Sequence, residues 1–277
     1  MTKKSLFIIT ALILSWSTIY AQKDLDQTTD ETSNLFEHGW SVHVNYGTTQ
    51  FDGDIRQSNS AAVQTGLLYQ ESDFKELRSA FSISLEKYIN KNISISIENV
   101  SGEFAGLRRP NEYVGYDVHD PYGLSSAEGL DGDKFVTSFI ETDILLNYNL
   151  NYNISKFIKT ELPKNLSIIV KFGFGLNEFR SLRTNLYTDN YIYSFGYDEL
   201  TKNESSDAVS ETVIVYGTKI KYEIQDGLSL LVDYTVRNNN SDKWDSSIMD
   251  GGNGGDKFSF FSFGLAYEIP KKVNTKD

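Results

Sequence analysis

One histidine and its neighbours are the residues of this sequence that could do acid–base chemistry. His43 follows Ser41 by two positions within the alternating segment 40–47. A serine, a histidine and a carboxylate can form an activated nucleophile, but only when each group orients the next. The other two histidines, His38 and His119, fall in a linker and a loop. We therefore predict no catalytic residue and no enzymatic activity.

Acidic residues gather in the segments between the alternating stretches, where carboxylate oxygens could bind calcium. Their spacing does not match an EF-hand loop, and Asp and Gly are also common turn residues. We therefore predict solvated loops, no metal site and no cofactor. The acidic residues are Asp52, Asp54, Asp131, Asp133, Asp242, Asp245, Asp250 and Asp256.

The composition excludes several classes of protein. The chain has 277 residues, no cysteine and a formal net charge of -12, with 17 tyrosines and 17 phenylalanines. Binding to nucleic acid requires clustered basic residues, so no nucleic-acid partner is expected. The absence of cysteine excludes disulfides. The high aromatic content is unusual for a mean hydropathy of -0.37 and indicates that the rings serve something other than a compact core.

The first residues predict export. Lys3 and Lys4 precede an apolar run over residues 6–16, and Ala21 offers a cleavage site, so residues 1–21 are expected to be a signal peptide. The run is too short for a transmembrane helix. Residues 22–38 read as a disordered acidic lead-in, residues 39–270 as an outer-membrane β-barrel and residues 271–277 as a C-terminal tail.

Apolar and polar residues alternate in eight segments, with the period of a β-strand. Each segment has one uniformly apolar face, with aromatic residues toward its ends, and one polar face. In a transmembrane barrel the apolar faces contact lipid and the polar faces line the interior. The segments are 40–47, 81–86, 93–98, 136–148, 166–177, 214–224, 228–237 and 261–269.

The polar faces carry charges that a barrel would enclose. An eight-stranded barrel has an interior only wide enough for side chains, so these charges are expected to pair rather than to line a pore. We expect Lys171, Lys219, Lys221 and Arg237 to be the partners of Glu98, Glu141, Asp143 and Asp233.

The connections between the segments supply an independent argument. Residues 89–92 and 225–227 form short turns, the second with an Asp-Gly pair suited to a tight hairpin, and 151–165 is a moderate link. The connections 52–78, 107–134, 181–210 and 238–256 are long. Short and long connections alternate strictly, as in outer-membrane barrels with short periplasmic turns and long outer loops. The sequence thus predicts an all-β, eight-stranded antiparallel transmembrane up-and-down barrel.

Several stretches resemble the OmpA-like and PagP-like small outer-membrane barrel families. They are residues 39–42 with Phe51-Asp52-Gly53-Asp54, residues 171–180, and Arg237 with residues 241–245. The resemblance implies a cell outer-membrane protein in contact with lipid. It does not extend to the peptidoglycan-binding domain of OmpA. Some barrels of this kind modify lipids, but their catalytic groups lie on the outer wall, whereas His43 falls on the polar face.

The last segment resembles the signal read by the barrel assembly machinery during insertion. Gly264, Tyr267 and Ile269 carry that resemblance, although Pro270 and the tail follow it.

Taken together, these features predict a non-catalytic integral outer-membrane protein that is structural or accessory to an envelope or secretion complex and interacts through its outer loops. The alternatives are a narrow channel or ligand-binding barrel and, third, a lipid-modifying enzyme.

Overall fold

The computed structural model describes residues 39–53, 55, 74–108, 132–198, 207–239, 243–246 and 255–269. The predicted signal peptide, the lead-in over residues 22–38 and the tail over residues 271–277 lie outside this part of the chain and remain predictions.

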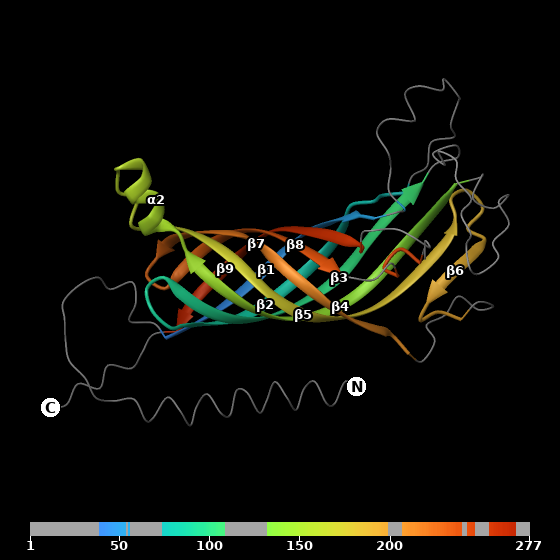
Figure 1. Ribbon diagram of the computed structural model, residues 1–277, viewed down its shortest axis with the longest axis horizontal. Coiled ribbons are helices and arrows are strands. Elements are labelled where there is room, and N and C mark those ends of the chain that lie inside the picture. The colour runs from blue at the N-terminus through green and yellow to red at the C-terminus, as the bar shows by residue number, and fades with distance from the viewer. Residues whose placement is uncertain are drawn as a thin grey trace, which may run out of the picture. The chain divides into compact units, whose positions relative to one another are not determined.

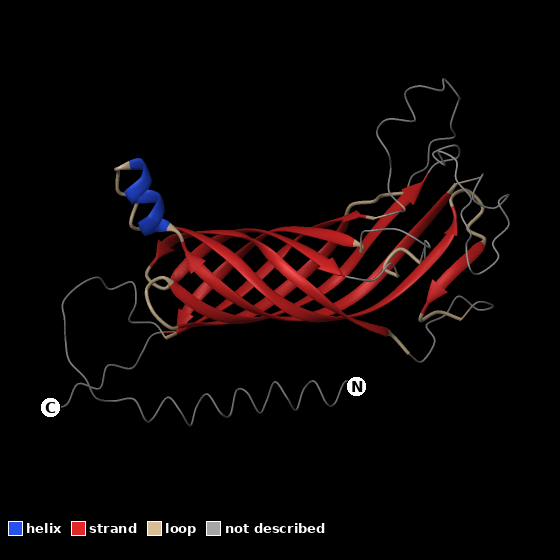
Figure 2. Cartoon of the chain, viewed as in Figure 1, coloured by secondary structure: helices blue, strands red, loops and turns tan. Residues whose placement is uncertain are grey.

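Eight antiparallel strands close into a barrel, as the sequence predicts, and a ninth strand extends it (Figures 1 and 2). Each barrel strand pairs with its neighbours along the chain, β1 pairs with β9, and β5 pairs with β4 on one side and β7 on the other. The barrel strands are β1 (Trp40–Asp52), β2 (Arg78–Tyr88), β3 (Ile93–Arg108), β4 (Asp133–Asn149), β5 (Leu166–Asn185), β7 (Val209–Gln225), β8 (Leu228–Asn239) and β9 (Lys257–Ile269).

The short turns lie together at one end of the barrel. Between β2 and β3, the Asn90 side chain accepts hydrogen bonds from the backbone N–H groups of Asn92 and Ile93. Between β7 and β8, Gly227 has φ 72°, a conformation that favours glycine in a tight hairpin. The four long connections leave from the opposite end, which is the extracellular end in barrels of this kind.

Four of the strands are much longer than a membrane crossing needs. A tilted strand crosses the hydrocarbon with about 9–11 residues, whereas β3, β4, β5 and β7 have 16, 17, 20 and 17 residues. The strand β6 (Tyr191–Phe195) pairs with β5 near residues 181–184 and continues this wall past the barrel (Figure 1). The prediction of a loop from residue 181 was therefore wrong. Beyond the belt the outward face of β5 is no longer uniformly apolar, so the alternation of apolar and polar residues that marked the strand ends there.

The link between β4 and β5, predicted only to be of moderate length, contains a helix. This helix, α2 (Asn151–Ile158), begins at the short-turn end of β4. Its apolar residues recur with helical spacing, a signal too short to stand out within one link. Among the described residues, no helix is long and apolar enough to cross a membrane.

Candidate functional site

Large apolar side chains form a belt on the outside of the barrel. On β9 the outward apolar residues run from Phe261 to Ile269, nine positions, which is the length of a membrane crossing. Phe172, Phe174 and Phe263 are 60–65% exposed, which would be costly in water. The exposed belt residues are Val44, Tyr46, Phe81, Ile83, Ile95, Ile97, Ile140, Ile144, Leu146, Phe172, Phe174, Leu176, Ile214, Tyr216, Ile220, Tyr222, Leu230, Tyr234, Phe261, Phe263, Leu265, Tyr267 and Ile269.

Beyond the belt the outward residues become polar. On β1 they change from Val44 and Tyr46 to Thr48 and Gln50. On β9, going from Phe261 toward the long connections, the next outward residues are Ser259 and Lys257. We call the part of the barrel that carries the belt the inner half, and the part between the belt and the long connections the outer half. The outer half therefore presents a surface suited to water.

Charged side chains fill the lumen of the inner half, and Lys171 joins two acids there. Its Nζ lies 3.1 Å from Glu98 Oε2 and 2.7 Å from Asp233 Oδ2, and all three side chains are buried. The three residues come from β5, β3 and β8, so the contact crosses the lumen. An enclosed ammonium group is stabilised only by such close partners.

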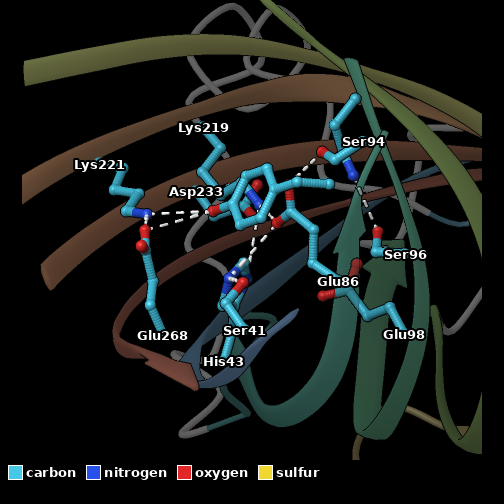
Figure 3. A network of polar contacts seen from close by, with 12 residues as sticks. Ser41, His43, Glu86, Ser94, Ser96, Glu98, Lys219, Lys221, Asp233 and Glu268 are labelled. Atoms are coloured by element: carbon cyan, nitrogen blue, oxygen red, sulfur yellow. Dashed lines mark hydrogen bonds and ion pairs between the residues drawn. The ribbon is translucent and has the colours of Figure 1, made fainter. Parts of the chain in front are cut away.

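The other two lysines pair with acids that the sequence analysis did not assign to them. Lys219 Nζ lies 2.9 Å from Glu86 Oε2, and Lys221 contacts Glu268 (Figure 3). Lys221 also donates a hydrogen bond to the Tyr88 hydroxyl. The predicted pairing with Glu98, Glu141, Asp143 or Asp233 was therefore wrong for these two lysines. Sequence shows which face carries a charge, but only the closed barrel shows which strand lies across the lumen.

Arg237 lies where the inner and outer halves meet. Its Nε lies 2.6 Å from Glu141 Oε1, and its Nη2 lies 3.7 Å from Asp143 Oδ2. Its guanidinium also lies 5.5 Å and 5.6 Å from the ring centres of Phe258 and Phe260. This side chain is fully buried and contacts both carboxylates and rings.

His43 is enclosed in the same network, together with a serine and a glutamate. Its Nε2 lies 2.9 Å from Ser41 Oγ and 3.3 Å from Glu86 Oε2, and its Nδ1 lies 3.4 Å from Lys219 Nζ (Figure 3). In a catalytic relay the nucleophile and the acid contact opposite ring nitrogens. Here both contact the same nitrogen, and a lysine lies at the other. The group therefore packs the lumen without forming a nucleophile–base–acid relay.

An aromatic cluster fills the lumen of the outer half. Phe104 packs against five rings, with centroid distances from 4.8 Å to Phe258 to 6.3 Å to Phe135. The sequence analysis missed this cluster because it took the inward face to be polar along its whole length. The signal was present, because phenylalanine replaces charge at inward positions toward the long connections. The cluster contains Phe51, Phe104, Phe135, Phe139, Phe179, Trp244, Phe258 and Phe260.

Trp244 enters this cluster from the connection between β8 and β9. Its side chain is fully buried, and its carbonyl accepts hydrogen bonds from the hydroxyl groups of Thr137 and Ser181. Its backbone N–H donates to Asp256 Oδ2 at 2.8 Å. Ile55, from the connection after β1, is also buried, and its N–H donates to Asp245 Oδ2 at 3.0 Å. Parts of two outer connections are thus components of the lumen.

Three of the acidic residues expected in solvated loops are buried instead, whereas Asp52, at the end of β1, is exposed. Asp133 is buried, and its Oδ2 accepts hydrogen bonds from Arg108 Nη2 and Arg183 Nε, each at 2.7 Å. Asp245 and Asp256 are buried as well, so the expectation of solvation was wrong for all three. Asp54, Asp131, Asp242 and Asp250 lie outside the described residues. Within the described ranges, no group of acidic or histidine side chains could hold a metal ion.

The proposed assembly signal lies on β9. Tyr267 and Ile269 point outward into the belt and are 53% and 44% exposed. Gly264 faces the lumen beside Asn45, where an added Cβ would lie 2.0 Å from the Asn45 amide oxygen. The glycine is therefore required by a close approach of two strands, whatever its role in assembly.

A closed antiparallel barrel with an apolar outer belt and enclosed ion pairs is a transmembrane β-barrel of the outer-membrane type, and this chain folds as one. No protein family model matches the sequence, and no curated protein matches it.

Solved outer-membrane proteins are similar to the chain in structure. Neisserial surface protein A has 9% identity and a TM-score of 0.43, covering 83% of this chain and 97% of its own. A major outer membrane protein from Thermus thermophilus has 13% identity and a TM-score of 0.40, covering 84% and 100%. The outer membrane enzyme PagL has 10% identity and a TM-score of 0.33, covering 83% and 99%. At such values the class follows from the geometry of this barrel alone.

Proposed function

We propose that this protein is a non-conducting, non-catalytic outer-membrane barrel that holds its extracellular connections for contacts with other molecules, as a structural or accessory member of an envelope complex. The observation that carries the proposal is the filled lumen. Ion pairs occupy the inner half, and the aromatic cluster occupies the outer half.

Two different kinds of packing would have to open before an ion could pass. In the inner half, a moving ion would have to displace Lys171 from two carboxylates. In the outer half it would have to cross a layer of rings around Phe104 and Trp244, which offers few polar partners. This combination disfavours the narrow channel and the ligand-binding barrel, because paired charges and packed rings occupy the described lumen in both halves.

Conductance in planar bilayers tests the closed lumen. We expect the reconstituted protein to show no sustained single-channel current steps at either polarity of the applied voltage. The double variant Phe104→Ala/Trp244→Ala removes two large buried rings from the outer half but keeps the ion pairs of the inner half, so it should also remain closed if each half blocks ions by itself. Stable conductance steps of the unaltered protein, reproduced in independent preparations, would refute the proposal.

The contacts of the outer connections can be tested by shortening them without opening the lumen. The connections after β1 and β8 contribute Ile55 and Trp244 to the packing, so they are poor choices. Residues 110–130, between β3 and β4, and residues 200–206, before β7, can each be replaced by a short Gly-Ser segment.

We expect the shortened proteins to keep the gel-mobility shift between unheated and boiled samples. We also expect them to lose proteins that co-purify with the unaltered chain in mild detergent. Recovery of the same complex from a folded variant with both segments replaced would contradict a role for these segments.

A further inference from the structure

The helix α2 exposes large apolar side chains that nothing in the described chain covers. Phe157 is 87% exposed and Ile158 is 47% exposed, and the helix has no buried residue. Such exposure is costly for a helix in water, where most of the stability of a short helix comes from packing one apolar face.

These apolar residues form a single stripe. Leu150, Ile154, Phe157 and Ile158 have the spacing i, i+4, i+7 and i+8, which places them on one side of a helix. Lys156 lies on the other side. The helix is therefore amphipathic, and within the described part of the chain Phe157 and Ile158 on its apolar side remain exposed.

The helix begins just past the lipid-facing belt, at the short-turn end of the barrel. The helix follows β4 directly, and the outward residue Leu146 of that strand is 51% exposed in the belt. Asn151 fixes the start of the helix to β5: its Oδ1 accepts a hydrogen bond from the N–H of Ile168 at 2.9 Å, and its Nδ2 donates to the carbonyl of Leu166. Figure 1 shows α2 leaving the strand ends and projecting beyond the outline of the barrel.

The charge of this link is opposite to that of the chain. Residues 150–165 contain Lys156, Lys159 and Lys164 against Glu161 alone, so the link has a net charge of +2 in a protein of -12. Basic residues beside an apolar helical face favour the surface of a membrane that contains anionic lipids.

We propose that α2 is an interfacial helix that lies in the headgroup region of the periplasmic leaflet, with Phe157 and Ile158 inserted among the lipids and its lysines near anionic phospholipid headgroups. The helix would extend the contact of the barrel with lipid sideways at one leaflet. The proposal rests on the transmembrane fold and does not depend on the proposed role of the outer connections.

The chain has no cysteine, so single cysteines can carry an environment-sensitive fluorophore. We would label Phe157→Cys, the polar-side control Lys156→Cys, and Leu146→Cys as a belt reference. Each protein would be placed in vesicles of phosphatidylethanolamine and phosphatidylglycerol, with and without lipids that carry a nitroxide quencher near the headgroup. Because the quencher is in both leaflets, the orientation of the barrel does not matter.

We expect the label at position 157 to emit at shorter wavelength and to be quenched more strongly than the label at 156. Position 146 should report lipid in every preparation, which separates failure of the helix from failure of the barrel to insert. Equal, water-like emission at 156 and 157, with 146 in lipid, would overturn the proposal. That result would also be the outcome if the stripe were reserved for a protein partner.

A second variant tests the role of charge. Replacing Lys156, Lys159 and Lys164 with glutamine removes the basic residues and leaves the apolar stripe intact. We expect quenching at position 157 to decrease in this variant when phosphatidylglycerol is present. Unchanged quenching would overturn the assignment of anionic phospholipid.

Discussion

The inner and outer halves of this barrel place opposite kinds of side chain on their two surfaces. In the inner half, residues such as Phe263 face outward and residues such as Lys171 face the lumen. In the outer half, Ser259 faces outward while Phe104 faces the lumen. The lumen there also encloses one charged group, Asp133 with Arg108 and Arg183, but rings form most of its packing. The backbone and its pairing continue through both halves, as the 13 residues of β1 paired with β9 show.

The difference follows from the solvent that surrounds each half. Lipid accepts apolar groups outside the inner half, so the lumen can hold paired charges that fix which strands lie opposite one another. Water surrounds the outer half, so its apolar residues pack inward, as in a soluble protein. One barrel therefore has two cores, and the predictions below test each core and the boundary between them.

We expect the largest effect at Arg237, because it contacts both cores. The substitution Arg237→Leu leaves Glu141 and Asp143 buried without their cation and removes contacts with Phe258 and Phe260. The free energy of unfolding should fall by about 3–5 kcal/mol. Urea titration of the protein in lipid vesicles, followed by gel mobility, measures this loss.

The double variant Arg237→Leu/Glu141→Leu is the control, because it removes one of the uncompensated charges. It should recover part of the lost stability. A loss below about 1 kcal/mol for the single variant, as for a surface ion pair, would contradict the view that these ion pairs are structural.

The second prediction compares two phenylalanines that differ in their surroundings. Phe104→Ala should cost about 3–5 kcal/mol of unfolding free energy, because it leaves a cavity among packed rings. Phe263→Ala, in the belt, should cost less, since mobile lipid chains can fill the space. The same urea titration applies to both variants. Equal losses would show that the outer half does not have a tightly packed core of its own.

The third prediction locates the boundary on a single strand. Phe263 and Ser259 both point outward from β9, four residues apart. Phe263→Arg should reduce the free energy of unfolding by about 2–4 kcal/mol if position 263 lies near the middle of the bilayer. Ser259→Arg should cost at most about 1 kcal/mol near the interface. A similar loss at both positions would place the belt higher than the exposed side chains indicate.

The smaller loss of the two ion-pair variants is expected at the periplasmic mouth. Lys221 pairs with Glu268, and their side chains are 12% and 8% exposed, so water can reach the pair. Lys221→Met should cost about 1–3 kcal/mol of unfolding free energy, the cost of a buried polar group that loses its partner. This loss should be smaller than that of Arg237→Leu in the same titration. The reverse order would mean that burial does not determine how much these ion pairs contribute to the free energy of unfolding.

Much of the inner half could be predicted from sequence. Alternation of lipid-facing and inward residues has a period of two, so the strand around Phe172 and Lys171 is recognisable without a structure. The alternation of short and long connections then indicated a transmembrane barrel. Long-range pairings such as Lys219 with Glu86 could not be predicted, because 133 residues separate the two along the chain.

The outer half was harder to predict, because its strands have less contrast between faces. Beyond the belt, residues such as Ser181 and Arg183 point inward while Leu182 points outward, and no simple rule of polarity marks the strand. The burial of Trp244 depends on a loop that folds back into the lumen. A segment of that kind has no periodicity from which its position could be inferred.

By itself, the sequence determined the class of fold, the number of barrel strands and the face of each strand that meets lipid, because these depend on local period and on the lengths of connections. The tertiary structure decided which charges pair across the lumen and that Phe104 and Trp244 close the outer half. It also decided that Ser41 and Glu86 both contact the same ring nitrogen of His43, Nε2. These features depend on barrel closure, which brings together side chains from strands that are distant in the chain.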